Sequence, residues 1–204
     1  VIPFYGAENR EMFAIEREAM DRPGRVVEAL EEILPSSGVL LDIGAGDGFV
    51  GEQLTSESRS VVALEPAAGM VNTRRPVRWV LGVAQSLPFR DDVFDGAYST
   101  WAYFFPGLHD VSQGLAEVVR VTKEGAPTVI VDNAGDDAFT AMAPHDIATD
   151  LSFWTDAGFK VEMIDTAFVF SSIEDARRLL TFYFGEHAKP ALRVEYRVAV
   201  MVRS

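Results

Sequence analysis

Three glycines and two carboxylates lie close together in the segment 39–50, which reads VLLDIGAGDGFV. Gly44, Gly46 and Gly48 stand at alternate positions directly after an apolar run, and a helical pattern follows them. A turn that carries no Cβ atoms allows a ligand to touch the main chain. We therefore predict a ligand-binding turn between a buried strand and a helix, with a tight turn that binds nothing as the alternative.

Glu65 closes the next apolar run, 60–64, and is the second feature with evident chemistry. A carboxylate at the end of the neighbouring strand can accept hydrogen bonds from both hydroxyls of a ribose. A dinucleotide fingerprint reads G-x-G-x-x-G and needs no acid before it, whereas here Asp42 precedes glycines at shorter intervals. Asp42 and Asp47 would repel a pyrophosphate and attract a ligand with sulfonium and ammonium groups. This disfavours an NAD-dependent oxidoreductase.

The elements that must position these residues follow a regular order. From residue 39 on, short apolar runs alternate with helical patterns, which favours parallel strands joined by crossover helices. We predict strands over 39–43, 60–64, 77–81, 96–100, 128–132, 159–170 and 193–202. We predict two helices within 8–34 and further helices over 49–55, 67–73, 111–121, 144–157 and 173–184. The fold class is therefore α/β, in a single domain.

The composition limits the possible partners. The chain has 204 residues, with 31 acidic and 18 basic side chains, a formal charge of -13 and no cysteine. Such a charge repels polyanions, which argues against nucleic-acid partners. The lack of cysteine excludes disulfides, thiolate zinc sites and cysteine nucleophiles, and fits a reducing cytosol. No window is apolar enough for membrane insertion, so we expect a cytoplasmic protein, monomeric or homodimeric.

Several short motifs together resemble the class I S-adenosylmethionine (SAM) dependent methyltransferases. They are Asp42 to Gly48, Glu65, Leu87-Pro88-Phe89, Phe94-Asp95 and the segment Glu117 to Val131. The sequence is most similar to the branch of small-molecule enzymes that includes ubiquinone and menaquinone methylases. The resemblance implies one Rossmann-like sheet, mostly parallel with an antiparallel C-terminal strand, and helices on both faces. It divides the domain into an N-terminal helical lid (1–37), a cofactor-binding core (38–133) and the remainder of the sheet (134–204).

The resemblance also implies SAM as the methyl donor and S-adenosylhomocysteine (SAH) as the product. The glycines would line the methionine part, Glu65 would hold the ribose, and Pro66 would lie beside the adenine. The full set of expected cofactor-binding residues is Asp42, Gly44, Ala45, Gly46, Gly48, Glu65, Pro66, Ala84, Gln85 and Ser99. Similar proteins carry an acid where this chain has Val83, so the adenine would depend on the backbone near Ala84, on Gln85 and on apolar walls.

Aromatic side chains crowd the loop after the predicted strand 96–100, where open parallel sheets bind ligands. The candidate substrate-binding residues are Tyr5, Trp101, Tyr103, Phe104 and His109. His109 and Tyr5 are the candidate catalytic bases, because either could take a proton from a hydroxyl nucleophile. The same aromatics could instead pack in the core, and His109 could cap a helix. No Asp, Glu or His cluster has metal-ligand spacing, so no metal is expected.

The predicted function is methyl transfer from SAM to a small-molecule acceptor by in-line displacement, with an oxygen, nitrogen or carbon nucleophile left open. Positioning alone can lower such a barrier by about 7–11 kcal/mol, so an acid–base pair is not required. The alternative is a non-catalytic SAM/SAH-binding or scaffold protein with a degenerate adenine site, for which Val83 is the main argument.

Overall fold

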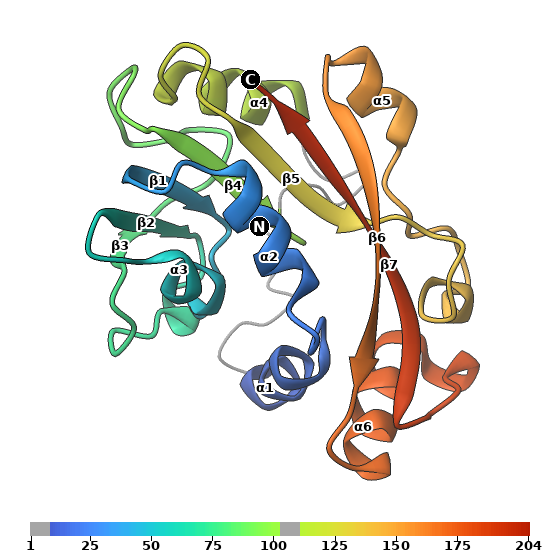
Figure 1. Cartoon of the computed structure of the whole chain (residues 1–204). Helices are drawn as coiled ribbons and strands as arrows, with labels where there is room; N and C mark the ends of the chain where they lie inside the picture. Colours follow the sequence, from blue (N-terminus) through green and yellow to red (C-terminus); the bar gives the residue numbers. More distant parts are fainter. Residues whose placement is uncertain (1–8, 103–110) are drawn as a thin grey trace.

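The computed structural model describes residues 9–102 and 111–204, and its centre is one seven-stranded sheet (Figure 1). The strands are β1 (Gly38–Ile43), β2 (Arg59–Glu65), β3 (Arg78–Leu81), β4 (Gly96–Thr100), β5 (Thr128–Asn133), β6 (Lys160–Val169) and β7 (Arg193–Arg203). Their order is β3-β2-β1-β4-β5-β7-β6. β1 to β5 pair in parallel, whereas β7 runs antiparallel to β5 and β6. The predicted mostly parallel α/β sheet with an antiparallel C-terminal strand is confirmed.

Helices cover both faces of the sheet (Figure 1). They are α1 (Arg10–Ala19), α2 (Arg25–Ile33), α3 (Phe49–Leu54), α4 (Val111–Val121), α5 (Leu151–Asp156) and α6 (Ile173–Phe184). Side chains alternate along each strand, so Leu40 of β1 packs on one face with α2, α3 and α6, and Leu41 on the other with α4 and α5. Among the described residues, no helix combines the length and apolarity that crossing a membrane requires.

The helix predicted over 67–73 is absent. The structure has only a short 3-10 turn there, Ala68–Met70. The carbonyl of Gly69 within this turn accepts a hydrogen bond from Arg10 Nε of α1 at 2.8 Å. A side chain from a distant helix thus takes an acceptor that a longer helix would have used for itself.

The helix predicted over 144–157 is shorter than expected, because α5 begins only at Leu151. The Asp150 carboxylate accepts hydrogen bonds from the backbone N–H groups of Ser152 and Phe153, which caps the helix at this point. The preceding residues, 143–150, form an irregular segment instead. This segment becomes part of the wall of the cavity described below.

α1 packs beside α6, although the two helices lie far apart in the sequence. Glu11 of α1 forms an ion pair with Arg178 of α6 at 2.7 Å, and Tyr183 Oη of α6 donates a hydrogen bond to the Glu16 carboxylate. These contacts hold α1 at the C-terminal ends of the parallel strands.

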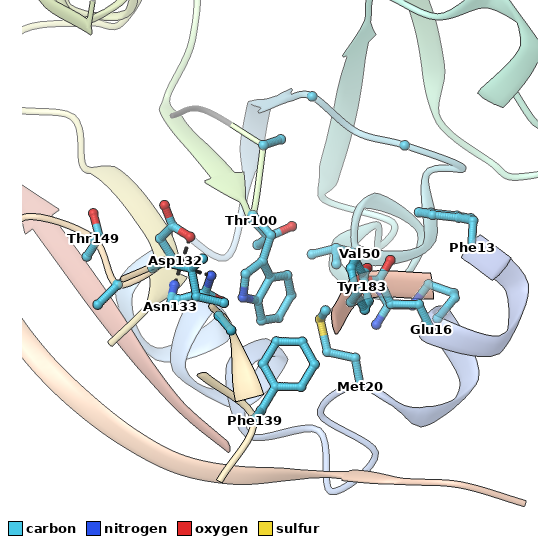
Figure 2. A pocket seen from close by; sticks show the side chains of 18 of the residues that line it. Phe13, Glu16, Met20, Val50, Thr100, Asp132, Asn133, Phe139, Thr149 and Tyr183 are labelled. Carbon is cyan, nitrogen blue, oxygen red and sulfur yellow. Dashed lines mark hydrogen bonds between the residues drawn. The ribbon is translucent and has the colours of Figure 1, made fainter. Parts of the chain in front are cut away.

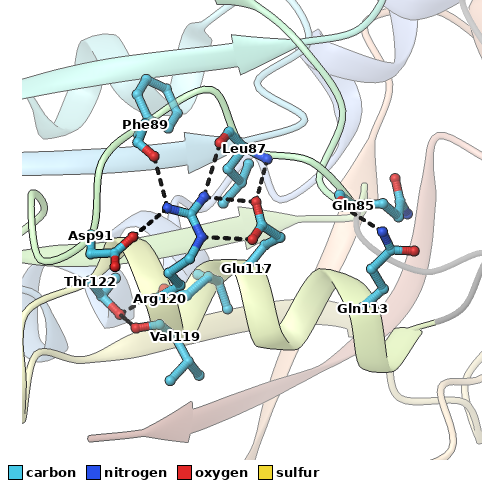
Figure 3. A network of polar contacts seen from close by, with 10 residues as sticks. Gln85, Leu87, Phe89, Asp91, Gln113, Glu117, Val119, Arg120 and Thr122 are labelled. Atoms are coloured by element: carbon cyan, nitrogen blue, oxygen red, sulfur yellow. Dashed lines mark hydrogen bonds and ion pairs between the residues drawn. The ribbon is translucent and has the colours of Figure 1, made fainter.

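A polar network centred on Arg120 fixes the loop that follows β3 (Figure 3). Arg120 of α4 donates hydrogen bonds to the Glu117 and Asp91 carboxylates and to the carbonyls of Leu87 and Phe89. Glu117 in turn accepts a hydrogen bond from the backbone N–H of Leu87 at 2.7 Å. The structure thereby explains why these motif residues occur together, since they join the loop to α4.

Candidate active site

A cavity of about 790 Å³ opens at the C-terminal ends of the parallel strands (Figure 2). One part, which we call the glycine half, is lined by Phe13, by Gly44 to Asp47 and by Glu65 to Ala67. The other part, the aromatic half, is lined by Trp101, Asp132, Asn133, Phe139, the segment 143–150, Phe153, Trp154 and Tyr183. Because the halves belong to one cavity, two small molecules could meet inside it.

The glycine turn after β1 exposes its main chain, because its backbone angles and close neighbours leave no room for side chains. Gly44 and Gly46 have φ angles of +74° and +57°, which side-chain-bearing residues rarely adopt. A Cβ atom on Gly44 would lie 2.3 Å from the Cβ of Ala102, and one on Gly46 would lie 3.1 Å from Cζ of Phe13. The predicted strand–turn–helix arrangement is therefore present, and Gly44, Ala45 and Gly46 line the cavity.

Glu65 joins the end of β2 to this turn. It is 6% exposed, and its Oε2 accepts a hydrogen bond from the backbone N–H of Gly46 at 2.9 Å. Its Oε1 accepts one from the N–H of Ala67 at 2.8 Å. Burial raises the pKa of the carboxyl, against these two hydrogen bonds. Each oxygen keeps a further lone pair for a ligand hydroxyl.

Asp42 lies between β1 and α3, next to the glycine turn, and is not part of the cavity lining. It is 1% exposed, and its side chain lies against α3, where a Cβ on Gly51 would be 3.4 Å from Oδ2. Its register partner on β4 is Tyr98. Neither the Asp42 carboxylate nor the Tyr98 hydroxyl makes a hydrogen bond of normal geometry among the described residues. Burial raises the Asp42 pKa to about 7, against the interaction with the nearby Tyr98 hydroxyl, which lowers it.

Gly48 and Ser99 also have packing roles outside the lining. A Cβ on Gly48 would lie 2.8 Å from the Trp79 ring, so this glycine permits the close approach of β3. Ser99 Oγ donates a hydrogen bond to the carbonyl of Ile43 at 2.8 Å and joins β4 to β1 just before the turn. A direct contact of Asp42, Gly48 or Ser99 with a cofactor stays a prediction.

The expected adenine segment around Ala84 and Gln85 lies outside the cavity lining as well. A bridge between Val83 and Ser86 closes this segment into a turn. The Gln85 carbonyl accepts a hydrogen bond from Gln113 Nε2 of α4 at 3.0 Å (Figure 3). The roles of Ala84 and Gln85 therefore stay predictions, whereas Pro66 does line the cavity.

Asp47 is less available to a cationic ligand than its place in the motif suggested. It lines the cavity, but Arg75 forms ion pairs with both Asp47 and Glu52. The charge of Asp47 is thus already balanced by a partly buried guanidinium. The expectation that Asp47 attracts a cationic ligand is therefore corrected, because Arg75 already pairs with it.

Arg17 is a cation in the cavity wall that the sequence analysis missed. Its guanidinium lies over the ring of Phe49, 4.3 Å from the centroid, and its Nε is buried without a hydrogen-bond partner among the described residues. Burial lowers its pKa, because the charged form is desolvated. An adjacent pair of opposite charges within an amphipathic helix, Glu16-Arg17, was the available signal.

The aromatic half is built around Trp101, which sits in the cavity wall at the end of β4. Its φ angle is +52°, a strained value for a non-glycine residue. Its Nε1 donates a hydrogen bond to Tyr196 Oη at 2.6 Å, and that hydroxyl donates in turn to Asn133 Oδ1. The predicted residues Tyr5, Tyr103, Phe104 and His109 lie outside the described residues.

Asp132 is the carboxylate of the aromatic half, and the sequence analysis missed it. It follows the apolar run of β5, just as Glu65 closes β2, and this parallel could have revealed it. Its Oδ1 accepts a hydrogen bond from the N–H of Asn133 at 2.8 Å. Burial raises its pKa to about 7, and likewise raises that of Glu16, on α1, to about 8.

Comparison with known proteins points to one family. Residues 41–130 match the family model described as a methyltransferase domain. Over this segment, which is less than half of its length, the chain is similar to that family. In fold, the chain is similar to the YcgJ protein of Bacillus subtilis, with a TM-score of 0.60 at 19% identity over 88% of this chain and 95% of that one.

Two curated relatives are similar in sequence to part of the chain. A demethylmenaquinone methyltransferase of Thermobifida fusca is 35% identical over 106 residues, which cover 48% of this chain and 44% of the relative. A 2-phytyl-1,4-naphtoquinone methyltransferase of Synechocystis is 34% identical over 106 residues, which cover 46% of this chain and 44% of the relative. The matched part thus spans less than half the length of either relative.

The glycine half of the cavity fits SAM. Gly44 and Gly46 offer bare main chain to the methionine part, and Glu65 can accept hydrogen bonds from the ribose hydroxyls. Arg17 offers a buried guanidinium to the methionine carboxylate. In the described part of the chain, no three His, Asp or Glu side chains are grouped to hold a metal ion.

Proposed function

We propose that the protein transfers the methyl group of SAM to a small-molecule acceptor bound in the aromatic half. The observation that carries this proposal is the single cavity of about 790 Å³, which joins the glycine turn and Glu65 to an aromatic-lined space. A donor and an acceptor can therefore lie side by side in it. The names of the two quinone-methylating relatives support a small, apolar acceptor.

The residues of this chain contribute mainly by positioning. SAM supplies a methyl group on a positively charged sulfur. Glu65 and the glycine turn fix the nucleoside and methionine ends, while Trp101 and Phe139 shape the space beside them. Correct alignment can account for about 7–11 kcal/mol of barrier lowering. Phe13 of α1, which lies against Gly46, excludes water from the glycine turn.

The proposal also covers the partners and the base. The formal charge of -13 favours small molecules over nucleic acid, and we propose a monomer or a homodimer. His109 and Tyr5 stay the predicted bases for a hydroxyl nucleophile. The non-catalytic alternative gains no support, because the similar relatives are named as methyltransferases.

Calorimetry with SAM and SAH tests the cofactor assignment. Wild-type protein should bind both, and Gly46→Leu should abolish binding, because a side chain at Gly46 would fill the space between the turn and Phe13. Gly125→Leu is the matched control, since Gly125 has a φ angle of +73° with nothing within 4 Å of its Cβ position. Equal affinity of the wild type and Gly46→Leu for SAH would disprove the site. Formation of SAH with an acceptor panel separates an enzyme from a scaffold.

A further inference from the structure

Asp132 is a part-buried carboxylate without a counterion. Among the described residues no basic side chain forms an ion pair with it, and its hydrogen bond comes from the N–H of Asn133. Figure 2 shows it across the cavity from Glu16 and Phe13, which belong to α1. A buried carboxylate in an apolar setting is costly unless a cation or several donors approach it. The cavity therefore holds a cation-binding group at the end away from α1.

The other charged groups of the lining are already committed or lie elsewhere. Asp47 is paired with Arg75, and Glu65 accepts two backbone hydrogen bonds. Asp150 caps α5, and Arg17 lies over Phe49 of α3. In the described part of the aromatic half, Asp132 is thus the carboxylate that faces the interior of the cavity.

The walls around Asp132 suit an organic cation. Trp101, Phe139 and Phe153 line the same space. Aromatic faces attract ammonium groups and bury the apolar part of the molecule that carries them. An anionic acceptor would meet the Asp132 carboxylate, so it would be repelled.

Given the proposed methyl transfer, we propose that the acceptor is an apolar or aromatic amine, that its ammonium group binds to the Asp132 carboxylate, and that Asp132 takes the proton before the transfer. One N–H proton passes to a carboxylate oxygen of Asp132. The freed nitrogen lone pair attacks the methyl carbon, and the carbon–sulfur bond breaks with its electron pair on sulfur. The products are an N-methylammonium ion, SAH and protonated Asp132, which releases its proton to water.

The surroundings of Asp132 are consistent with such a proton acceptor. Burial places its pKa at about 7, so the group can both accept and release a proton near neutrality. Tyr196 of β7 faces it, but burial raises the pKa of that phenol, which donates to Asn133. The other titratable groups among the described lining residues are His145, Asp146 and Asp150 of the adjoining segment, Glu16 and Arg17 of α1, Tyr183 of α6, and Asp47 and Glu65 of the glycine half.

A binding experiment with three shape-matched probes tests the proposal. With SAH saturating, the affinities of 2-phenylethylamine, 2-phenylethanol and 3-phenylpropanoate are measured by calorimetry or ligand-observed NMR. The wild type should bind the amine at least tenfold more tightly than the alcohol and should bind the acid least. Asp132→Asn should reduce the preference for the amine to within about twofold. Asp146→Asn is the matched control and should keep it, because Asp146 is an exposed carboxylate at the rim.

The outcomes separate three ideas. Equal or absent binding of the three probes to the wild type, or an amine preference that survives Asp132→Asn, overturns the proposal. A loss of SAM affinity in Asp132→Asn with unchanged SAH affinity also overturns it, because the carboxylate would then serve the sulfonium. Failure of the wild type to bind SAH contradicts the proposed function itself. Thermal unfolding of both variants verifies that each is folded.

Discussion

Oε2 of Glu65 accepts a hydrogen bond from the backbone N–H of Gly46 at 2.9 Å. This contact links the ends of two neighbouring parallel strands and joins the Glu65 carboxylate, the proposed ribose-binding group, to the glycine turn. The two features that the sequence shows separately are therefore one structural unit. A change at Glu65 should affect both the shape of the turn and the affinity for the ligand.

Glu65→Gln should weaken the binding of SAM and SAH by about 10-fold or more. The amide replaces one acceptor oxygen with a donor, and hydrogen bonds to charged groups contribute about 1.5–3 kcal/mol each. Calorimetry with SAH measures the effect. Glu57→Gln is the control, because Glu57 is exposed and lies outside the cavity lining. Unchanged affinity in Glu65→Gln would show that the ribose binds elsewhere.

Gly48→Ala should destabilise the protein by about 1–3 kcal/mol more than Gly24→Ala. The two glycines precede α3 and α2 with nearly equal φ angles, +79° and +78°, but only the Gly48 Cβ would meet a neighbour, the Trp79 ring at 2.8 Å. Urea unfolding gives the difference. Gly48→Ala combined with Trp79→Phe should recover part of the loss, and equal losses in the two single variants would contradict the packing role.

Asp42→Asn should flatten the pH dependence of stability between pH 4 and pH 7. Burial raises the Asp42 pKa to about 7 in the folded state, so the folded protein binds more protons than the unfolded chain in this range. The free energy of unfolding of the wild type therefore falls as pH rises, because the buried carboxyl must ionise. Over this range the free energy of unfolding of the unliganded Asp42→Asn variant should fall by about 1–2 kcal/mol less than that of the wild type. Equal slopes for the two proteins would contradict the raised pKa.

Tyr196→Phe should destabilise the protein by about 1–3 kcal/mol. The hydroxyl accepts from Trp101 Nε1 at 2.6 Å and donates to Asn133, so its removal leaves a donor and an acceptor without partners. Tyr98→Phe is the matched control, since that buried hydroxyl makes no hydrogen bond of normal geometry among the described residues. Chemical denaturation should show a clearly smaller loss for Tyr98→Phe, and equal losses would refute the proposed hydrogen-bond chain.

The sheet and the glycine turn could be predicted because their signals are local. The apolar runs gave the seven strands, and three glycines between a strand and a helix gave the turn. The face on which Asp42 lies was also within reach, because it follows Leu40 by two positions and shares its side of the sheet. The two shortened helices were misjudged, since Arg10 and the Asp150 cap compete there with the helical pattern.

The meeting of Arg17 and Asp132 at one cavity could not be predicted in the same way. Arg17 and Asp132 lie far apart in the sequence, and only the packing of α1 against α6 and the end of β5 brings them to one cavity. Desolvation by that packing, rather than any motif, gives Asp132 and Glu16 their raised pKa values. Such effects depend on the closed tertiary structure, so residue spacing does not reveal them.

The hydrogen bond from Arg10 to the Gly69 carbonyl has a kinetic consequence. Together with the contact between Phe13 and Gly46, it holds α1 over the glycine half of the cavity. If SAM binds at the glycine turn as proposed, we expect the exchange of SAH for SAM to require that α1 moves away from this turn. The rate of exchange would then depend on how readily this one hydrogen bond breaks.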